Sequence, residues 1–274
     1  MASIEPYFLN PTALPAMPEL ASRLLQGMER DDLTLATVAE WIGRDQSLAS
    51  KVLRLANSAR FGARQTVASL REASLLIGLR DLRNLTLAAC MSTVFPKHAP
   101  FDRGRFWRHG VATAGHAQAL APLCDLDPDV AYLGGLILRT GRLLMLMTDP
   151  DAVARTEAAA VEPDSLIAQE CALIGCPHTA VSAELARRWN FPSHLCGALA
   201  AAGDPLAAPD LPQGAVLRLA ATLADAGERR LPEVEVLCSL HPTLIGRLGL
   251  DLDRLGAELL PFDALTVGVD QLMG

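Results

Sequence analysis

The sequence lacks the features of a membrane or exported protein. None of its uninterrupted apolar stretches approaches the ~18–20 residues of a membrane span; the longest, from Ala131 to Leu138, is far too short. The N-terminus begins MASIEPYFLN and has no basic region ahead of an apolar segment, so it is not typical of a secretory signal. We therefore expect a soluble, cytoplasmic protein that makes no use of a membrane.

Positive charge is also scarce, with 24 Lys and Arg against 31 Asp and Glu and a net charge of −7 over 274 residues. This balance argues against a general binder of nucleic acids, whose non-specific affinity comes from neutralised phosphates. The charge is uneven, however. The segment 51–83 holds seven basic and two acidic residues, so it could present a basic face to a partner.

Paired cysteines and nucleotide-binding loops are missing. The six cysteines form no C-x-x-C pair, so we expect reduced, mostly buried side chains and no cysteine-ligated zinc. The chain contains no Gly-x-Gly-x-x-Gly loop, no Walker-type loop and no convincing Ser/His/Asp order. These absences disfavour several enzyme classes.

Apolar residues recur at helical spacing along nearly the whole chain, and strand signals are weak, so the sequence predicts an all-α fold. Thr34 and Asp45 are expected to cap helices, and Ser69 with Glu72 forms a capping-box pattern. Gly134 and Gly135 indicate close packing of helices. Two segments look like linkers: 149–164, with mixed charges and prolines near its ends, and 203–214, rich in proline and glycine.

Several separated motifs follow one another along the chain: Leu14-Pro-Ala-Met-Pro-Glu19, the run from Leu48 to Ser58, Leu75-Leu-Ile-Gly-Leu-Arg80, Phe106-Trp-Arg-His109, Gly175-Cys-Pro-His178 and Trp189-Asn-Phe-Pro192. Together they resemble one family, the HDOD (HD-related output domain) proteins of bacterial signalling. The resemblance covers residues 11–205 and implies two helical lobes. We expect an N-terminal lobe over 1–98 and an HD-like lobe over 99–205, which a linker and C-terminal helices in 206–274 complete.

The family is similar to HD-type metal-dependent phosphohydrolases, which hold metal with a first histidine, an adjacent His-Asp pair and a later aspartate. By this resemblance His109 stands at the first histidine and Asp225 at the late aspartate, and His178 is a further histidine of the pattern. The His-Asp pair is replaced by Leu138-Arg139. Because arginine keeps its positive charge, we expect no metal, no cofactor and no hydrolysis. We hypothesise that Arg139 pairs with Asp225 or a neighbouring carboxylate; the alternative is that Arg139 points into solvent.

The resemblance implies a regulatory, non-catalytic protein that acts by contact with signalling proteins, with a role in motility or stress responses. A candidate contact surface is the basic cluster of Arg54, Asn57, Arg60 and Arg64. Two alternatives stay open: a metal-dependent phosphohydrolase acting on a nucleotide or cyclic dinucleotide, and a DNA-binding regulator that uses a helix-turn-helix pattern over 38–52. The negative net charge disfavours nucleic acid as a partner. A small nucleotide ligand stays open as a further possibility, although no residues identified in the sequence support it.

Overall fold

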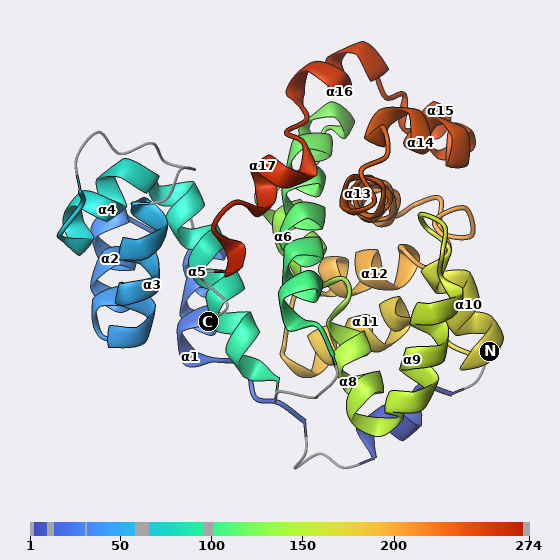
Figure 1. Ribbon diagram of the computed structural model, residues 1–274, viewed down its shortest axis with the longest axis horizontal. Coiled ribbons are helices and arrows are strands. Elements are labelled where there is room, and N and C mark those ends of the chain that lie inside the picture. Colours follow the sequence, from blue (N-terminus) through green and yellow to red (C-terminus); the bar gives the residue numbers. More distant parts are fainter. Residues whose placement is uncertain (1–2, 10–13, 31, 58–65, 96–100, 271–274) are drawn as a thin grey trace. The chain divides into compact units, whose positions relative to one another are not determined.

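The computed structural model describes residues 3–9, 14–30, 32–57, 66–95 and 101–270, and within these ranges it is helical without strands (Figure 1). The chain divides into two compact units. The small unit consists of residues 15–108 and 266–274, and the large unit of residues 1–14 and 109–265. The sequence placed this division at residues 98/99. In the structure it falls within helix α6, after Arg108, and the last residues belong with the small unit.

In the described residues, the small unit contains the helices α1 to α5 and the first turns of α6. Its helices are α1 (Glu19–Arg30), α2 (Leu35–Gly43), α3 (Gln46–Ala56), α4 (Leu70–Ile77) and α5 (Leu79–Val94). Side-chain capping explains where α2, α3 and α4 begin, as predicted. The Thr34 side chain accepts from the N–H of Thr37, and Asp45 accepts from the first-turn amides of α3. Gly78 lies between α4 and α5 with φ +82°, a conformation that strains residues with a Cβ.

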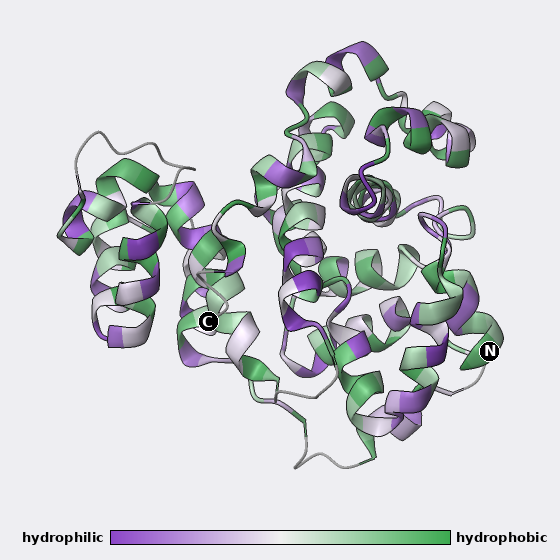
Figure 2. Cartoon of the chain, in the orientation of Figure 1, coloured by the Kyte–Doolittle hydropathy of each residue, from purple (hydrophilic) through white to green (hydrophobic). Residues whose placement is uncertain are grey.

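The large unit holds the remaining helices. They are the short 3-10 helix η1 (Glu5–Phe8), the rest of α6 (Arg103–Leu120), η3 (Ala121–Cys124), α7 (Pro128–Ile137), α8 (Thr140–Thr148), α9 (Pro150–Ala159), α10 (Leu166–Leu173), α11 (His178–Arg188), α12 (Ser193–Ala201), α13 (Pro212–Glu228), α14 (Glu233–Leu240), α15 (Pro242–Leu248), α16 (Leu252–Glu258) and α17 (Phe262–Thr266), which crosses into the small unit at its last residue. Helix α11 packs against α8 and α12, and α13 packs against α7, α12 and α14. Helix α12 lies against α7, α11 and α13, and Figure 2 shows that apolar residues dominate it.

Two glycines illustrate how closely helices pack in the large unit. A Cβ on Gly135 of α7 would lie 2.7 Å from the Cα of Ala114 on α6, which confirms the predicted close packing. A Cβ on Gly141 of α8 would lie 2.4 Å from the carbonyl oxygen of His178. The segment Pro128–Thr148 is long and apolar enough to span a membrane, but 83% of it is buried within the protein. It therefore behaves as the core of a helical bundle.

Two expectations from the sequence were wrong. The segment 149–164 is not a linker, because α9 occupies most of it and packs against α8 and α10. Its prolines misled the prediction: Pro150 stands in the first turn of α9, where a missing N–H costs nothing. All six cysteines are free, but only Cys90 and Cys176 are buried. The expectation of mostly buried cysteines therefore fails.

Candidate functional site

Asp225 is the centre of a buried network in the large unit. This residue of α13 is 5% exposed. Its Oδ1 lies 3.0 Å from His109 Nε2 and 2.9 Å from Arg139 Nη2. Its Oδ2 accepts from the backbone N–H of Asp164 at 3.0 Å. The structure thus brings together three of the predicted site residues, and the ion pair between Arg139 and Asp225 is present. The Arg139 side chain is 16% exposed, so it does not point into open solvent.

The electrostatics of this network favour an ionised Asp225 and a neutral His109. Burial acts to raise the pKa of Asp225, but the Arg139 charge and the hydrogen bond from His109 outweigh it, and the pKa lies well below its usual range. Burial lowers the pKa of His109, and the Arg139 charge lowers it further. A neutral imidazole donates from one nitrogen only. We therefore assign the proton to Nε2, which leaves Nδ1 to face the hydroxyl of Thr113 at 3.2 Å.

His178 belongs to a second network, built around Glu170 of α10. Nδ1 of His178 lies 2.7 Å from Glu170 Oε2, which also accepts the His178 backbone N–H at 2.8 Å. Nε of Arg142 lies 3.7 Å from the other oxygen of Glu170. Burial acts to raise the pKa of Glu170, but the charge of His178 and its hydrogen bond reverse this, so the pKa is lowered. The sequence analysis missed both Glu170 and Arg142, because only the fold places them beside His178.

A third cluster surrounds Asp164, which adopts a left-handed backbone conformation at φ +62°. Its carboxylate pairs with Arg218 at 2.5 Å and with Nε2 of His241 at 3.1 Å. The Arg218 guanidinium also lies 3.3 Å from the carbonyl oxygens of both Ala202 and Gly203. By the family resemblance these two positions correspond to paired histidines. Arg218 is thus a second arginine of the site, after Arg139, and it contacts the backbone of Ala202 and Gly203. The sequence analysis did not identify it.

The space between these networks is small. A cavity of about 10 Å³ is lined by ten residues: Leu138, Arg139, Asp164, Leu166, Ile167, His178, Ala202, Arg218, Ala221 and Asp225. This volume is at the lower limit for one water molecule and leaves no room for a nucleotide. Leu138 is 2% exposed and donates no metal ligand, although its backbone carbonyl accepts from the hydroxyl of Ser182.

The residues of this site do not fit the metal that the family resemblance suggests. In the described part of the chain, His, Cys, Asp and Glu side chains form no group of three that could hold a metal ion. Asp225 and His109 are adjacent, but the Arg139 guanidinium contacts the same carboxylate oxygen as His109. A divalent cation at that oxygen would face a permanent positive charge at close range, which is strongly unfavourable in a buried setting.

The proposed contact surface in the small unit is described only in part. Arg54 is exposed on α3, whereas Arg60 and Arg64 lie outside the described residues. Asn57 has a structural role. Its side-chain amide donates to the carbonyl of Val67 and accepts from the Val67 N–H, at 2.9 and 2.8 Å. The side chain of Asn57 therefore holds Val67 beside the end of α3, and its hydrogen-bonding groups are already engaged.

Comparison with known proteins gives consistent results. The sequence profile described as the HDOD domain matches residues 14–205. A structure from Shewanella amazonensis SB2B, provisionally named a phosphohydrolase, is 27% identical with a TM-score of 0.75, over 97% of this chain and 98% of that one. A Geobacter sulfurreducens HDOD domain protein of unknown function is 26% identical with a TM-score of 0.71, over 90% and 88%.

A curated relative, an uncharacterised protein of Treponema pallidum (strain Nichols), is 28% identical over 184 residues. That alignment covers 64% of this chain and 35% of the relative. The chain therefore matches only about a third of the relative's length.

Proposed function

The chain belongs to the HDOD family, and we propose that it is a regulatory member that acts by binding other proteins and does not hydrolyse phosphate esters. The observation that carries this proposal is the contact of the Arg139 guanidinium with the carboxylate of Asp225, 2.9 Å apart. By the family resemblance, Asp225 corresponds to the aspartate with which HD-type hydrolases hold a metal ion, and such an ion activates water.

The arrangement around Asp225 supports a structural role for these residues. The carboxylate is satisfied by Arg139, His109 and the backbone of Asp164, so the buried charge is paired and hydrogen-bonded without an ion. The second network satisfies Glu170 in the same way, with His178 and Arg142. The side chains of the two networks instead connect α6, α8, α10, α11 and α13.

A regulatory protein of this kind would transmit a signal through its surface. We infer a bacterial cytoplasmic protein whose partners are signalling proteins, with a role in motility or stress responses, as the family resemblance implies. The exposed Arg54 on α3 is one point at which a partner could bind. Two observations support a binding role rather than catalysis. The cavity beside Asp225 is small, and the described part of the chain has no group of three metal-binding side chains.

The absence of hydrolysis can be tested with the purified full-length chain. We expect substoichiometric iron, manganese and zinc by elemental analysis, and no turnover of an aryl phosphodiester or a cyclic dinucleotide when these metals are added. The matched control is the His109→Ala variant, which should behave in the same way. Stoichiometric metal together with a turnover that is lost in His109→Ala would overturn the proposal in favour of a phosphohydrolase.

The binding part of the proposal needs a separate experiment. The chain would be cross-linked in its native cells and the attached proteins identified, in parallel with an Arg54→Glu variant and with an Arg187→Glu control on an exposed part of α11. We expect a defined partner that is lost with Arg54→Glu and kept with the control. If no protein is enriched over an unrelated cytoplasmic protein, the binding role is wrong.

A further inference from the structure

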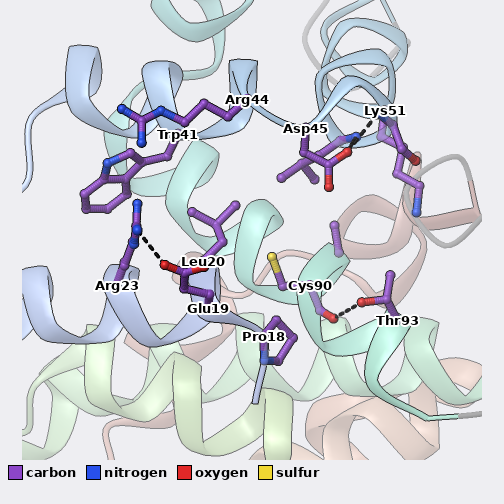
Figure 3. Close-up of a pocket in the computed structure, with 13 residues that line it drawn as sticks. Pro18, Glu19, Leu20, Arg23, Trp41, Arg44, Asp45, Lys51, Cys90 and Thr93 are labelled. Atoms are coloured by element: carbon purple, nitrogen blue, oxygen red, sulfur yellow. Dashed lines mark hydrogen bonds and ion pairs between the residues drawn. The ribbon is translucent and has the colours of Figure 1, made fainter. Parts of the chain in front are cut away.

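A much larger cavity lies in the small unit, and none of the residues of the three buried networks lines it. Its volume is about 430 Å³, within the ~300–1,000 Å³ range of small-molecule pockets. Residues of α1, α2, α3 and α5 and of the turn between α2 and α3 line it (Figure 3). The HDOD resemblance assigns no ligand to it, and neither does the function proposed above.

One end of this pocket is aromatic and basic. Figure 3 shows Trp41 between Arg44 above and Arg23 below. Each arginine makes an ion pair on its own helix, Arg23 with Glu19 and Arg44 with Glu40. The arginine side chains are 43% and 62% exposed. Such exposed pairs contribute little free energy, so a bound anion could replace them. An indole flanked by guanidinium groups is suited to stacking against a planar ring.

Lys51 lies at the other end, and its position points to an anion. Among the described residues its ammonium group makes no hydrogen bond or ion pair, although Lys51 is partly buried. Asp45 is nearby in Figure 3, but its Oδ1 accepts the backbone N–H groups of Ser47 and Leu48 at 2.9 and 3.0 Å. That carboxylate therefore caps α3 and does not pair with Lys51. Burial and the nearby charge of Arg54 lower the pKa of Lys51, and the charge of Asp45 offsets part of this effect.

The floor between these two ends is apolar and includes Leu20, Leu48 and Ala89. Cys90 also lies there, and burial raises the pKa of its thiol to about 11, so the thiol remains uncharged at neutral pH. The pocket thus combines an aromatic platform, an apolar floor and a lysine that makes no hydrogen bond or ion pair among the described residues.

We propose that this pocket binds a small phosphate ester that carries a planar ring, of the size of a nucleoside monophosphate. The ring lies against Trp41 and the phosphate is bound by Lys51. Charge-assisted hydrogen bonds to phosphate are the stronger class of hydrogen bond, and stacking on the indole adds affinity that inorganic phosphate alone would lack. Binding in the small unit would give the protein a chemical input in addition to its protein partners.

Adenosine monophosphate is the probe, with adenosine and inorganic phosphate as its two halves. Isothermal titration calorimetry on the full chain should show that the monophosphate binds more tightly than either half. Lys51→Gln should weaken binding of the monophosphate by about tenfold or more and leave adenosine unchanged. Trp41→Leu should weaken both. Arg71→Gln on α4 is the control: it also removes one positive charge from an exposed helix of the small unit, outside the pocket, and should leave binding unchanged.

Fluorescence locates the binding event. The monophosphate should quench tryptophan emission in the native chain, and the quenching should disappear in Trp41→Leu although Trp107 and Trp189 remain. The proposal is overturned if no heat or quenching is seen up to about 10 mM, a range that includes weak millimolar binding. It is also overturned if inorganic phosphate binds as tightly as the monophosphate, or if Lys51→Gln and Arg71→Gln behave alike. None of these outcomes depends on whether the chain hydrolyses phosphate esters.

Discussion

Replacing Arg139 with methionine tests whether this side chain stabilises the fold where the related hydrolases hold a metal. Methionine keeps a long unbranched side chain and removes only the guanidinium. In the variant, Asp225 keeps the hydrogen bond from His109, the backbone N–H of Asp164 and a more distant contact with Arg229 at 3.7 Å. It loses the charged partner at 2.9 Å.

The expected cost is about 3 kcal/mol in the free energy of unfolding. Removing one partner of a buried pair typically costs about 3–5 kcal/mol, because the other charge is left buried without compensation. We expect the lower end, since Asp225 retains three contacts and Arg139 is partly exposed. Adding Asp225→Asn to Arg139→Met should recover part of the loss, because the double variant buries neither charge. The coupling free energy from this cycle should be about 1–3 kcal/mol.

The pH dependence gives a second, independent readout. The pKa of Asp225 is depressed in the folded chain, so its contribution is present above the unfolded carboxyl pKa of about 3.9 and is lost as the pH falls toward the folded value. Without Arg139 the pKa of Asp225 in the folded chain rises toward its unfolded value. The variant therefore has little stabilisation from ionised Asp225 to lose when the pH falls below about 4. The difference in stability between the native chain and the variant should be constant above about pH 5 and should narrow below about pH 4.

Urea unfolding followed by far-UV circular dichroism measures these quantities. The control is Arg187→Met in the same unit, where Arg187 makes an exposed ion pair with Glu184; we expect a change of about 0.5 kcal/mol or less. If Arg139→Met costs no more than this control, or if the difference does not narrow in acid, Arg139 does not stabilise Asp225. The guanidinium would then not be a structural replacement for a metal ion.

Other substitutions test the packing and the remaining buried histidine. Gly141→Ala should destabilise the chain by about 3 kcal/mol, because the new Cβ would lie 2.4 Å from the carbonyl oxygen of His178. Gly256→Ala should stabilise α16 by about 0.5–1 kcal/mol in the same urea assay, since a Cβ there meets nothing within 4 Å. The two glycine substitutions must therefore change the free energy of unfolding in opposite directions. Burial lowers the pKa of His116 to about 3, so between about pH 6 and 4 this histidine binds a proton only in the unfolded chain, and it contributes a loss of stability of about 1.4 kcal/mol per unit of falling pH. His116→Leu should remove that slope from a pH series of unfolding curves, and an unchanged slope would show that His116 is not neutral in the folded chain.

The sequence predicted the helical class and several helix boundaries well, because these depend on neighbouring residues. Asp45 caps α3, and the side chain of Ser69 accepts the N–H of Glu72 at the start of α4, as expected. The partner of the Glu72 side chain is the N–H of Ala68, one residue before the expected one. The failure at 149–164 shows the limit of such signals, since Pro150 is equally compatible with a linker and with a helix start.

The replacement of a His-Asp pair by Leu138-Arg139 could be read from the sequence alone, because it follows from residue identity within a motif. Which groups meet Asp225 could not. His109 lies 116 residues before it and Arg139 lies 86 before it, and no local pattern specifies a contact over that separation. The packing of α6, α7 and α13 sets those distances. It also decides the pairing of His178 with Glu170, the exposure of the cysteines and the presence of the pocket beside Trp41, since each depends on side chains that only the folded chain brings together.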